Sequence, residues 1–414
     1  MAYQDLTTER YFSAVRRYVL SSGERFATVV DADGVPAYYP TCVILAQRTQ
    51  GISVETMAAL ARDLVHIGLW AVRERIDLNA RLEAGLYFRQ VEVETLAEAC
   101  GMKTAALRQL TSRSVSEIRR SASISKQDLV INTLKSRRLT TALLYFDFVG
   151  KMSEAWQPKR SSELQTRIED RNEMTRLIKA HRPRVRSSRV RNTVSAADLA
   201  RVAAFVATGS ASAIWKNESL ALRNWALIKV LVGTGIRQGE GRQLKAGDID
   251  LIGCELRVER RHDDPEDPRS LEPNAKTYDR TIPFNDGLAQ ALEDYLLGPG
   301  SDAAAKKGSS FVFLTHDNRT FGTPISAHTA RKVVRDLGAH LGIEGLTPHQ
   351  LRHGWIQNLA DWAISEGINA SDFERFANNL GGWSYMSKMA TEYRGDQITK
   401  AAYEAGILVE CARS

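Results

Sequence analysis

The sequence predicts a mainly α-helical protein with a small β-sheet or hairpin in its second half. Between Met57 and Trp70, apolar residues recur at helical spacing, which is typical of an amphipathic helix that buries one face. The stretch 220–231 is apolar enough to form a buried core helix. The runs that favour strands are short, and they lie at 251–259, 275–284 and 311–314.

Residues 1–50 are predicted to form a separate extension. A helical pattern at 11–20 is followed by extended pieces at 26–30 and 38–44. Asp31-Ala-Asp-Gly34 lies between the extended pieces and is typical of a turn. We therefore expect a short helix followed by a small hairpin.

Residues 51–182 are predicted to form a helical domain. Ser53 is a candidate cap for its first helix, and Trp70 is expected in the core. Further helices are expected near 93–101, 103–120, 126–155 and 160–180. One of them carries a basic cluster, Lys135, Arg137 and Arg138. This cluster is either a solvated helix face or a helix that lies along a DNA backbone.

A basic linker is predicted at 183–194. The stretch from Lys179 to Arg191 contains no acidic residue, and its proline and serines favour an extended segment. Its candidate phosphate contacts are Arg184, Arg186, Arg189 and Arg191. A second domain is expected to begin near Ser195, with helices around 196–208, 219–232 and 326–341. The last helix has a basic face that we expect to meet DNA, formed by Arg331, Lys332 and Arg335.

Composition narrows the class of protein. The chain has 414 residues, a formal net charge of +7 and a pI of about 9.2, which favours a polyanionic partner. No apolar run approaches the roughly 20 residues needed to span a membrane, and the N-terminus lacks a signal-peptide pattern. The cysteines are scattered, which favours a reducing compartment and argues against a cysteine-built zinc site. They are Cys42, Cys100, Cys254 and Cys411.

The stretch Thr347-Pro-His-Gln-Leu-Arg-His353 is the motif around which the other candidate residues are arranged. Thr347 can cap a helix and Pro348 suits its first position. His349 and Arg352 are three residues apart and so share one helix face. An imidazole and a guanidinium at a helix N-terminus form a phosphate site with a group that can transfer a proton.

Four further motifs surround this helix start in the sequence. Gly233-Thr-Gly-Ile-Arg237-Gln-Gly-Glu240 places a carboxylate three residues after an arginine. The predicted hairpin at 275–284 carries Lys276 and Arg280. Leu380-Gly-Gly-Trp383 and then Tyr393 follow the central motif. Taken singly, each has an ordinary structural explanation, such as a helix-end ion pair between Arg237 and Glu240.

Arg, Lys, His-x-x-Arg, Trp and Tyr in this order resemble the catalytic residues of the tyrosine recombinases, the phage-integrase family, over roughly residues 195–405. The resemblance implies a two-lobed DNA clamp of the kind shared with type IB topoisomerases. It implies a core-binding domain at 51–182, a catalytic domain at 195–395, and a C-terminal segment, 396–414. In relatives that segment docks into a neighbouring protomer, a role open here to Ile407, Leu408 and Val409.

The resemblance also implies roles for single residues. Arg237 and Arg352 would stabilise the phosphate, and Lys276 would protonate the leaving oxygen. Arg280 is a rival to Lys276, although an arginine hardly gives up a proton. Tyr393 would be the nucleophile, with His349 and Trp383 assisting. Glu240 and His353 would support the site.

Two features depart from the family pattern. The gap from Trp383 to Tyr393 is about one residue longer than usual, and two glycines precede Trp383 where relatives commonly have Leu-Gly. Tyr385 and Tyr403 are the other tyrosines near this position.

The function implied is that of a site-specific DNA recombinase or integrase that works through a 3′-phosphotyrosine and a Holliday junction. Its partners would be a double-stranded recombination site, further copies in a dimer on DNA and a tetramer in the synapse, and accessory proteins. No metal, ATP or other cofactor is expected. A bacterial mobile element, a transposon or plasmid, is the expected source, and the nucleoid of the cytoplasm the expected location. Two alternatives stay open: a type IB topoisomerase-like relaxing enzyme and an inactive DNA-binding accessory protein.

Overall fold

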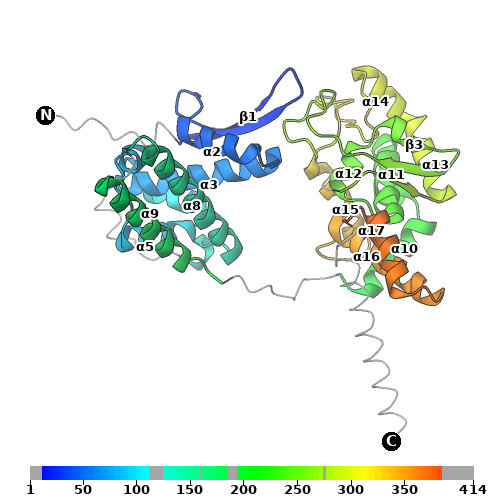
Figure 1. The fold of residues 1–414 in the computed structure, drawn as a ribbon. Coiled ribbons are helices and arrows are strands. Elements are labelled where there is room, and N and C mark those ends of the chain that lie inside the picture. The colour runs from blue at the N-terminus through cyan, green and yellow to red at the C-terminus, as the bar shows by residue number, and fades with distance from the viewer. Residues whose placement is uncertain (1–11, 112–124, 159–160, 185–193, 274–276, 385–414) are drawn as a thin grey trace, which may run out of the picture. The chain divides into compact units, whose positions relative to one another are not determined.

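The computed structural model describes residues 12–111, 125–158, 161–184, 194–273 and 277–384 (Figure 1). The chain forms two units of tertiary structure, and the division along the chain falls between Ser188 and Arg189. That point lies within the linker predicted at 183–194. None of the described helices combines the length and apolar character needed to cross a membrane.

The first unit is mainly helical. Its core surrounds Trp70, which is 0% exposed and packs against the rings of Phe88 and Phe146. The prediction that Trp70 is a core residue is therefore confirmed, as is the Ser53 cap, whose side chain accepts from the Thr56 N–H. The helices are α2 (Tyr38–Arg48), α3 (Val54–Arg73), α4 (Leu78–Glu83), α5 (Gln90–Cys100), α6 (Thr104–Thr111), α8 (Asn132–Glu154) and α9 (Ser162–Ala180).

The prediction for residues 1–50 was wrong in three places. The expected helix at 11–20 is instead strand β1 (Ala14–Val19), which pairs antiparallel with β2 (Arg25–Val30). The hairpin turn is at 20–24, where Gly23 has φ of 86°, and not at 31–34. Residues 38–44, expected to be extended, begin α2. Both strands and α2 pack against α3, so these three elements belong to the first unit.

Local sequence was misleading at α2 for an identifiable reason. Tyr-Tyr-Pro-Thr-Cys-Val-Ile is rich in residues that favour strands, but Pro40 stands in the first helical turn, where its missing N–H removes no helical bond. Val43 and Ile44 are both 0% exposed. Burial of their side chains therefore outweighs the weak intrinsic preference.

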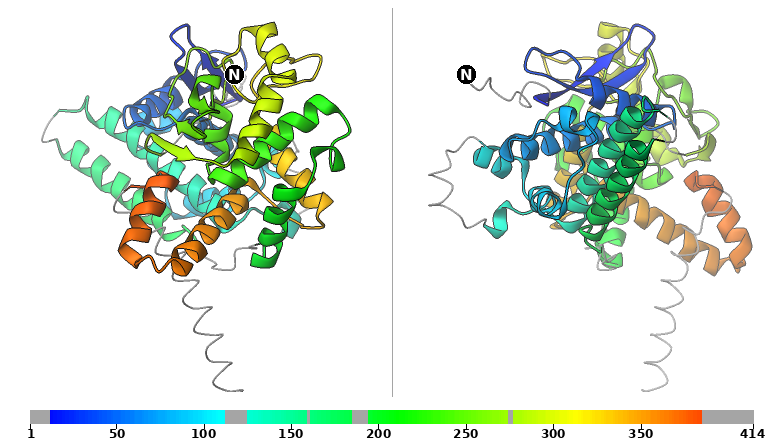
Figure 2. Two further views of the ribbon diagram at one scale, coloured as in Figure 1. Left: turned by 90° about the vertical axis from the view of Figure 1, so that its right-hand side faces the viewer. Right: turned by 60° about the vertical axis from the view of Figure 1, so that its left-hand side comes forward.

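The second unit is arranged around α11 (Glu218–Thr234) (Figures 1 and 2). This helix contacts α10 (Ala196–Thr208), α12 (Gln238–Gln243), α13 (Asp286–Leu296), α14 (Pro299–Lys307), α15 (Ala327–His340) and α16 (Pro348–Ser365). Leu227 and Ile228 of α11 are 0% exposed and belong to one large apolar core. The prediction of a buried core helix here is confirmed. The last described helix of this unit is α17 (Ala370–Gly381).

A three-stranded antiparallel sheet stands beside these helices. Its order is β3 (Ile249–Asp250), β4 (Glu255–Val258) and β5 (Arg280–Pro283), and Val258 pairs with Arg280. The run 275–284 thus contributes one strand to a sheet, where a self-contained hairpin was expected. The run 311–314 forms isolated bridges, Lys245 with Phe311 and Leu314 with Pro324.

Candidate active site

Helix α16 begins where the sequence predicts. The Thr347 hydroxyl accepts a hydrogen bond from the Gln350 N–H at 3.4 Å, and the Gln350 side chain accepts from the Thr347 N–H at 2.7 Å. Pro348 takes the first helical position. This reciprocal cap fixes the first turn, so that Arg352 points into the unit while His349 stays exposed.

Arg352 joins three elements. Arg352 is 3% exposed. Its Nη1 donates to the backbone oxygen of Gly235 and its Nη2 to that of Gly381, each at 2.7 Å. Gly235 is the left-handed cap residue of α11, with φ of 62°, and Gly381 ends α17. The guanidinium carbon also lies 4.9 Å from the centre of the Trp383 ring. These contacts hold Arg352 in one orientation.

Arg237 lies close to the same point. It caps α12, and its backbone N–H donates to Glu240 Oε2 at 2.8 Å. Its Nη1 is 3.4 Å from both Glu240 Oε1 and the Gly381 oxygen. The two arginines, predicted from motifs more than 100 residues apart in the sequence, therefore share the Gly381 carbonyl. The Arg237 side chain is 35% exposed, so it also faces solvent.

Glu240 is the buried carboxylate of this site. It is 1% exposed and forms an ion pair with Arg280, whose Nη2 is 2.9 Å from Oε2, and it accepts a hydrogen bond from the Thr277 hydroxyl. Burial acts to raise the pKa of Glu240, but the Arg280 charge and these hydrogen bonds outweigh it and lower that pKa below 4.5. Glu240 is therefore ionised at neutral pH.

The lowered pKa of Glu240 leads to a testable prediction. A carboxyl whose pKa is depressed on folding stabilises the fold above its unfolded value, and this stability is lost as pH falls through the folded pKa. Glu240→Gln leaves Arg280 without its buried counter-charge, so we expect about 3 kcal/mol less unfolding free energy at pH 7. Urea unfolding should show this difference at pH 7 and a smaller one below the ordinary value of 4.5.

The matched control is Glu344→Gln, which changes an exposed glutamate of the same unit. It should leave stability within about 0.5 kcal/mol at either pH. An equal loss for Glu240→Gln at both pH values would contradict the role given to its charge.

His349 and His353 lie side by side on the first two turns of α16. Their Nε2 atoms are 2.7 Å apart and their ring centres 4.1 Å apart. In such a contact one Nε2 carries a hydrogen and donates a hydrogen bond, and the other Nε2 accepts that bond. The role of His353 as a supporting residue stays a prediction; the structure places it in contact with His349.

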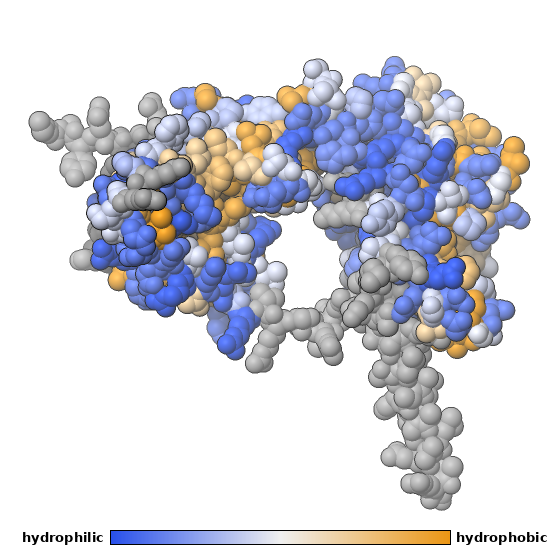
Figure 3. All heavy atoms as spheres, in the orientation of Figure 1, coloured by the Kyte–Doolittle hydropathy of each residue, from blue (hydrophilic) through white to orange (hydrophobic). Residues whose placement is uncertain are grey.

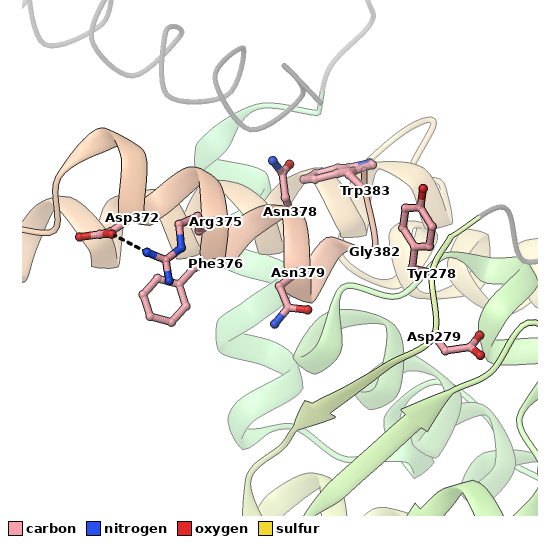
Figure 4. Close-up of a pocket in the computed structure, with 9 residues that line it drawn as sticks. All are labelled: Tyr278, Asp279, Asp372, Arg375, Phe376, Asn378, Asn379, Gly382 and Trp383. Atoms are coloured by element: carbon pink, nitrogen blue, oxygen red, sulfur yellow. Dashed lines mark ion pairs between the residues drawn. The ribbon is translucent and has the colours of Figure 1, made fainter. Parts of the chain in front are cut away.

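Trp383 borders a cavity of about 560 Å³ that is also lined by Tyr278, Asp279 and one side of α17 from Asp372 to Asn379 (Figure 4). The backbone N–H of Trp383 donates to the backbone oxygen of Asn378 at 2.9 Å. Gly382, directly before Trp383, also lines this cavity and has φ of 64°. A Cβ at Gly382 would stand 2.5 Å from Arg280 Nη1, so the chain can pass this close to the guanidinium only at glycine.

Two residues predicted to contact DNA lie in the interior instead. Arg138 is 5% exposed and donates to the backbone oxygens of Cys100 and Met102, and Arg280 is 7% exposed beside Glu240. Because both side chains are buried, neither can contact DNA in this structure. Sequence alone missed this because basic residues are normally exposed.

The other basic candidates differ in their surroundings. Lys135 is half-buried, and Arg137 forms a two-pronged ion pair with Asp63 while staying 51% exposed. Figure 3 shows that the visible face of the second unit is mostly hydrophilic. Exposed cations occur at the end of α9 and on α15, namely Arg184, Arg331, Lys332 and Arg335.

Several predicted residues lie outside the described part of the chain. The most important are Lys276 and Tyr393, together with the rival tyrosines Tyr385 and Tyr403. The remaining ones are the linker arginines Arg186, Arg189 and Arg191, the segment 396–414 with Ile407, Leu408 and Val409, and Cys411.

Sequence reasoning missed Thr277 and the two glycine carbonyls. Thr277 is 5% exposed, donates to Glu240 and accepts from Arg280 Nη1 at 3.1 Å. The feature of the sequence that could have indicated Thr277 as a site residue is its position directly after Lys276. The carbonyls of Gly235 and Gly381 carry no side-chain signal, because any residue type provides the same oxygen.

One group of potential metal ligands occurs in the described residues. His262, Asp263 and Glu272 offer ligand atoms within 4.8 Å of one another. The Glu272 carboxylate accepts the N–H groups of Asp263 and Asp264 at 2.9 and 3.3 Å. These bonds account for its buried position in the loop between β4 and β5.

Comparison with known proteins supports the family resemblance seen in the sequence. Residues 207–395 match the sequence profile of the phage integrase family. The likeness to this family therefore covers most of the second unit.

The chain matches curated relatives over only part of the relatives' length. Tyrosine recombinase XerC of Roseiflexus castenholzii is 28% identical over 138 residues, 33% of this chain and 39% of the relative. Tyrosine recombinase XerD of Halalkalibacterium halodurans is 28% identical over 165 residues, 40% of this chain and 47% of the relative. The matched region thus spans less than half of either relative.

A solved structure of the Tn1549 transposon integrase in complex with transposon right end DNA is 14% identical. The likeness covers 87% of this chain and 98% of that one, with a TM-score of 0.43. At that score the likeness is a distant one.

Proposed function

We propose that this protein is a site-specific DNA recombinase of the integrase type. The observation that carries the proposal is the meeting of Arg237 and Arg352 at the Gly381 carbonyl beside Trp383. Two guanidinium groups fixed at one point suit the developing charge of a phosphate under attack. The match of residues 207–395 to the phage integrase family supports the same chemistry.

The proposed reaction exchanges one phosphoester bond for another. The Tyr393 oxygen attacks the phosphorus, a tyrosine–phosphorus bond forms at the 3′ end, and the bond to the 5′ oxygen breaks. Lys276 gives a proton to that leaving oxygen, and His349 assists in accepting the phenol proton. Because the phosphotyrosine keeps the bond energy, a 5′ hydroxyl of another strand can reverse the step and join the ends. Neither ATP nor a metal ion is required in this scheme.

The proposal extends to the DNA grip and the assembly. Residues 51–182 would form the core-binding domain and 195–395 the catalytic domain, joined by the basic linker. Arg331, Lys332 and Arg335 on α15 and Arg184 would contact phosphates, so binding should weaken as salt rises. A tetramer would pass through a Holliday junction, with the segment 396–414 exchanged between protomers. We place the protein on a bacterial mobile element, acting in the cytoplasm at the nucleoid.

Covalent capture tests this proposal. The full chain is incubated, without metal or ATP, with a nicked suicide substrate built from the DNA that flanks its own reading frame. Loss of the short fragment beyond the nick traps the intermediate. A protein–DNA band that survives a denaturing gel is the expected result. Salt-sensitive DNA binding with no such band on any flanking sequence would favour the accessory-protein alternative.

The capture experiment also separates recombination from simple relaxation. A recombinase should convert a plasmid with two sites into recombinant products and leave a plasmid without a site unchanged. Relaxation of a supercoiled plasmid that has no site would instead support the type IB topoisomerase-like alternative.

A further inference from the structure

We propose that Arg280 is a positioning residue that holds the Arg237 cap and the Leu380–Trp383 turn at a fixed distance from each other. The proposal rests on the proposed function, because it assigns Arg280 a part in strand cleavage. It replaces the predicted roles of Arg280 as a DNA contact or a rival proton donor.

Arg280 connects three segments that are distant in sequence. Its Nε donates to the Leu380 backbone oxygen at 2.8 Å, and its Nη2 donates to Glu240 Oε2 at 2.9 Å. Its Nη1 donates to the Thr277 hydroxyl at 3.1 Å. The side chain is 2% exposed, so these bonds form away from water. One planar group therefore ties α12, the start of β5 and the end of α17 together.

Two of these segments hold the site arginines directly. Glu240 accepts the Arg237 N–H at 2.8 Å, and this bond closes the cap of α12. Leu380 precedes Gly381, whose carbonyl accepts from Arg352 at 2.7 Å. A shift of Arg280 would thus move the two anchors of the phosphate site relative to each other.

The backbone beyond Gly381 rests on the same guanidinium. A Cβ at Gly382 would stand 2.5 Å from Arg280 Nη1, 2.8 Å from its Cζ and 2.8 Å from the Thr277 Cβ. Gly382, the left-handed residue directly before Trp383, therefore packs closely against Arg280 and Thr277. Lysine cannot take over this task, since its ammonium is a single point and has no planar fork.

Geometry separates this role from simple stabilisation. A buried ion pair is often no better for stability than apolar side chains of similar size. Apolar side chains, however, could not hold the Glu240 carboxylate and the Leu380 oxygen in one plane. The arrangement favours fixed geometry at the site, where a displacement of about 1 Å can cost about a hundredfold in rate.

The test compares Arg280→Lys with Arg269→Lys in the full chain. Arg269 is a matched control: it is paired with buried Asp267 at 2.7 Å and donates to the oxygens of Ile325 and Arg242. Single-turnover formation of the covalent complex is measured at saturating DNA. We expect about a hundredfold slower cleavage for Arg280→Lys and less than about threefold for Arg269→Lys. DNA affinity should stay within about twofold in both.

Hydrogen exchange provides a readout that does not depend on activity. The amides of Gly382 and Trp383 donate to the oxygens of Asn379 and Asn378. We expect faster exchange at these two amides in Arg280→Lys alone, while amides of α11 and α13 exchange as in the wild type. Unchanged exchange at Gly382 and Trp383 would overturn the proposal.

The other outcomes are also informative. Equal cleavage rates for the two lysine variants would overturn the proposal, and so would a loss of DNA affinity that accounts for the slower cleavage. If the wild type forms no covalent complex, the proposed function fails, and hydrogen exchange still decides whether Arg280 holds the turn. If Arg280→Lys unfolds, Thr277→Val removes only the hydroxyl between Arg280 and Glu240, and about tenfold slower cleavage is then expected.

Discussion

The Tyr393→Phe variant is expected to form no covalent protein–DNA complex, while binding DNA as the wild type does. Removal of the phenol oxygen removes the atom that would bond to phosphorus, and no other change of shape accompanies it. A free phenol has a pKa of about 10. The charges of Arg237 and Arg352 would make it reactive near neutral pH. The measurement is the covalent band on a denaturing gel, with DNA binding followed in parallel.

Two other tyrosines are the controls for this result. Tyr385→Phe and Tyr403→Phe should each give covalent complex at a rate within about threefold of the wild type. A band that survives in Tyr393→Phe and disappears in Tyr385→Phe would move the nucleophile to Tyr385. That outcome would also explain the longer gap between Trp383 and Tyr393.

Arg352→Lys is expected to slow covalent-complex formation by about 10²- to 10³-fold, the usual effect of losing one preorganised donor to a developing oxyanion. The guanidinium spans the oxygens of Gly235 and Gly381, both at 2.7 Å, and lies 4.9 Å from the Trp383 ring. A lysine keeps the charge but cannot span both oxygens in one plane. Single-turnover kinetics at saturating DNA measure this effect.

Arg201→Lys is the control for that substitution. Arg201 also donates to a backbone oxygen, that of Leu341, but its side chain is 56% exposed and pairs with Asp198 on the surface of α10. Its cleavage rate should stay within about twofold. A rate for Arg352→Lys close to that of Arg201→Lys would mean that Arg352 is a structural residue only.

Local chemistry explains what the sequence predicted well. Thr347 and Pro348 start α16 because a hydroxyl cap and a missing N–H act within four residues. Ser195 caps α10 in the same way, accepting from the Asp198 N–H. The order of the site motifs indicated Arg237 and Arg352 together, and the structure brings both to Gly381.

Long-range contacts explain what the sequence did not predict. Glu240 was expected to brace the site or to pair with Arg237 at its own helix end, yet its principal partner is Arg280, 40 residues away. Nothing in the local pattern of either residue specifies that pairing. The strand at 14–19 likewise depends on its pairing with the strand at 25–30. A segment whose apolar residues have helical spacing can still form a strand when a turn brings it beside a partner strand.

The use of main-chain oxygens to hold Arg352 has a consequence for how this site can change by mutation. A point mutation cannot delete a carbonyl, so random drift cannot erase these anchors as it would erase a carboxylate side chain. It can only displace them. The positions sensitive to mutation are therefore the two glycines. A Cβ at Gly235 would stand 2.2 Å from the Trp355 ring, and a Cβ at Gly381 would stand 2.8 Å from the Trp383 ring. A side chain at either position would displace a carbonyl that holds Arg352.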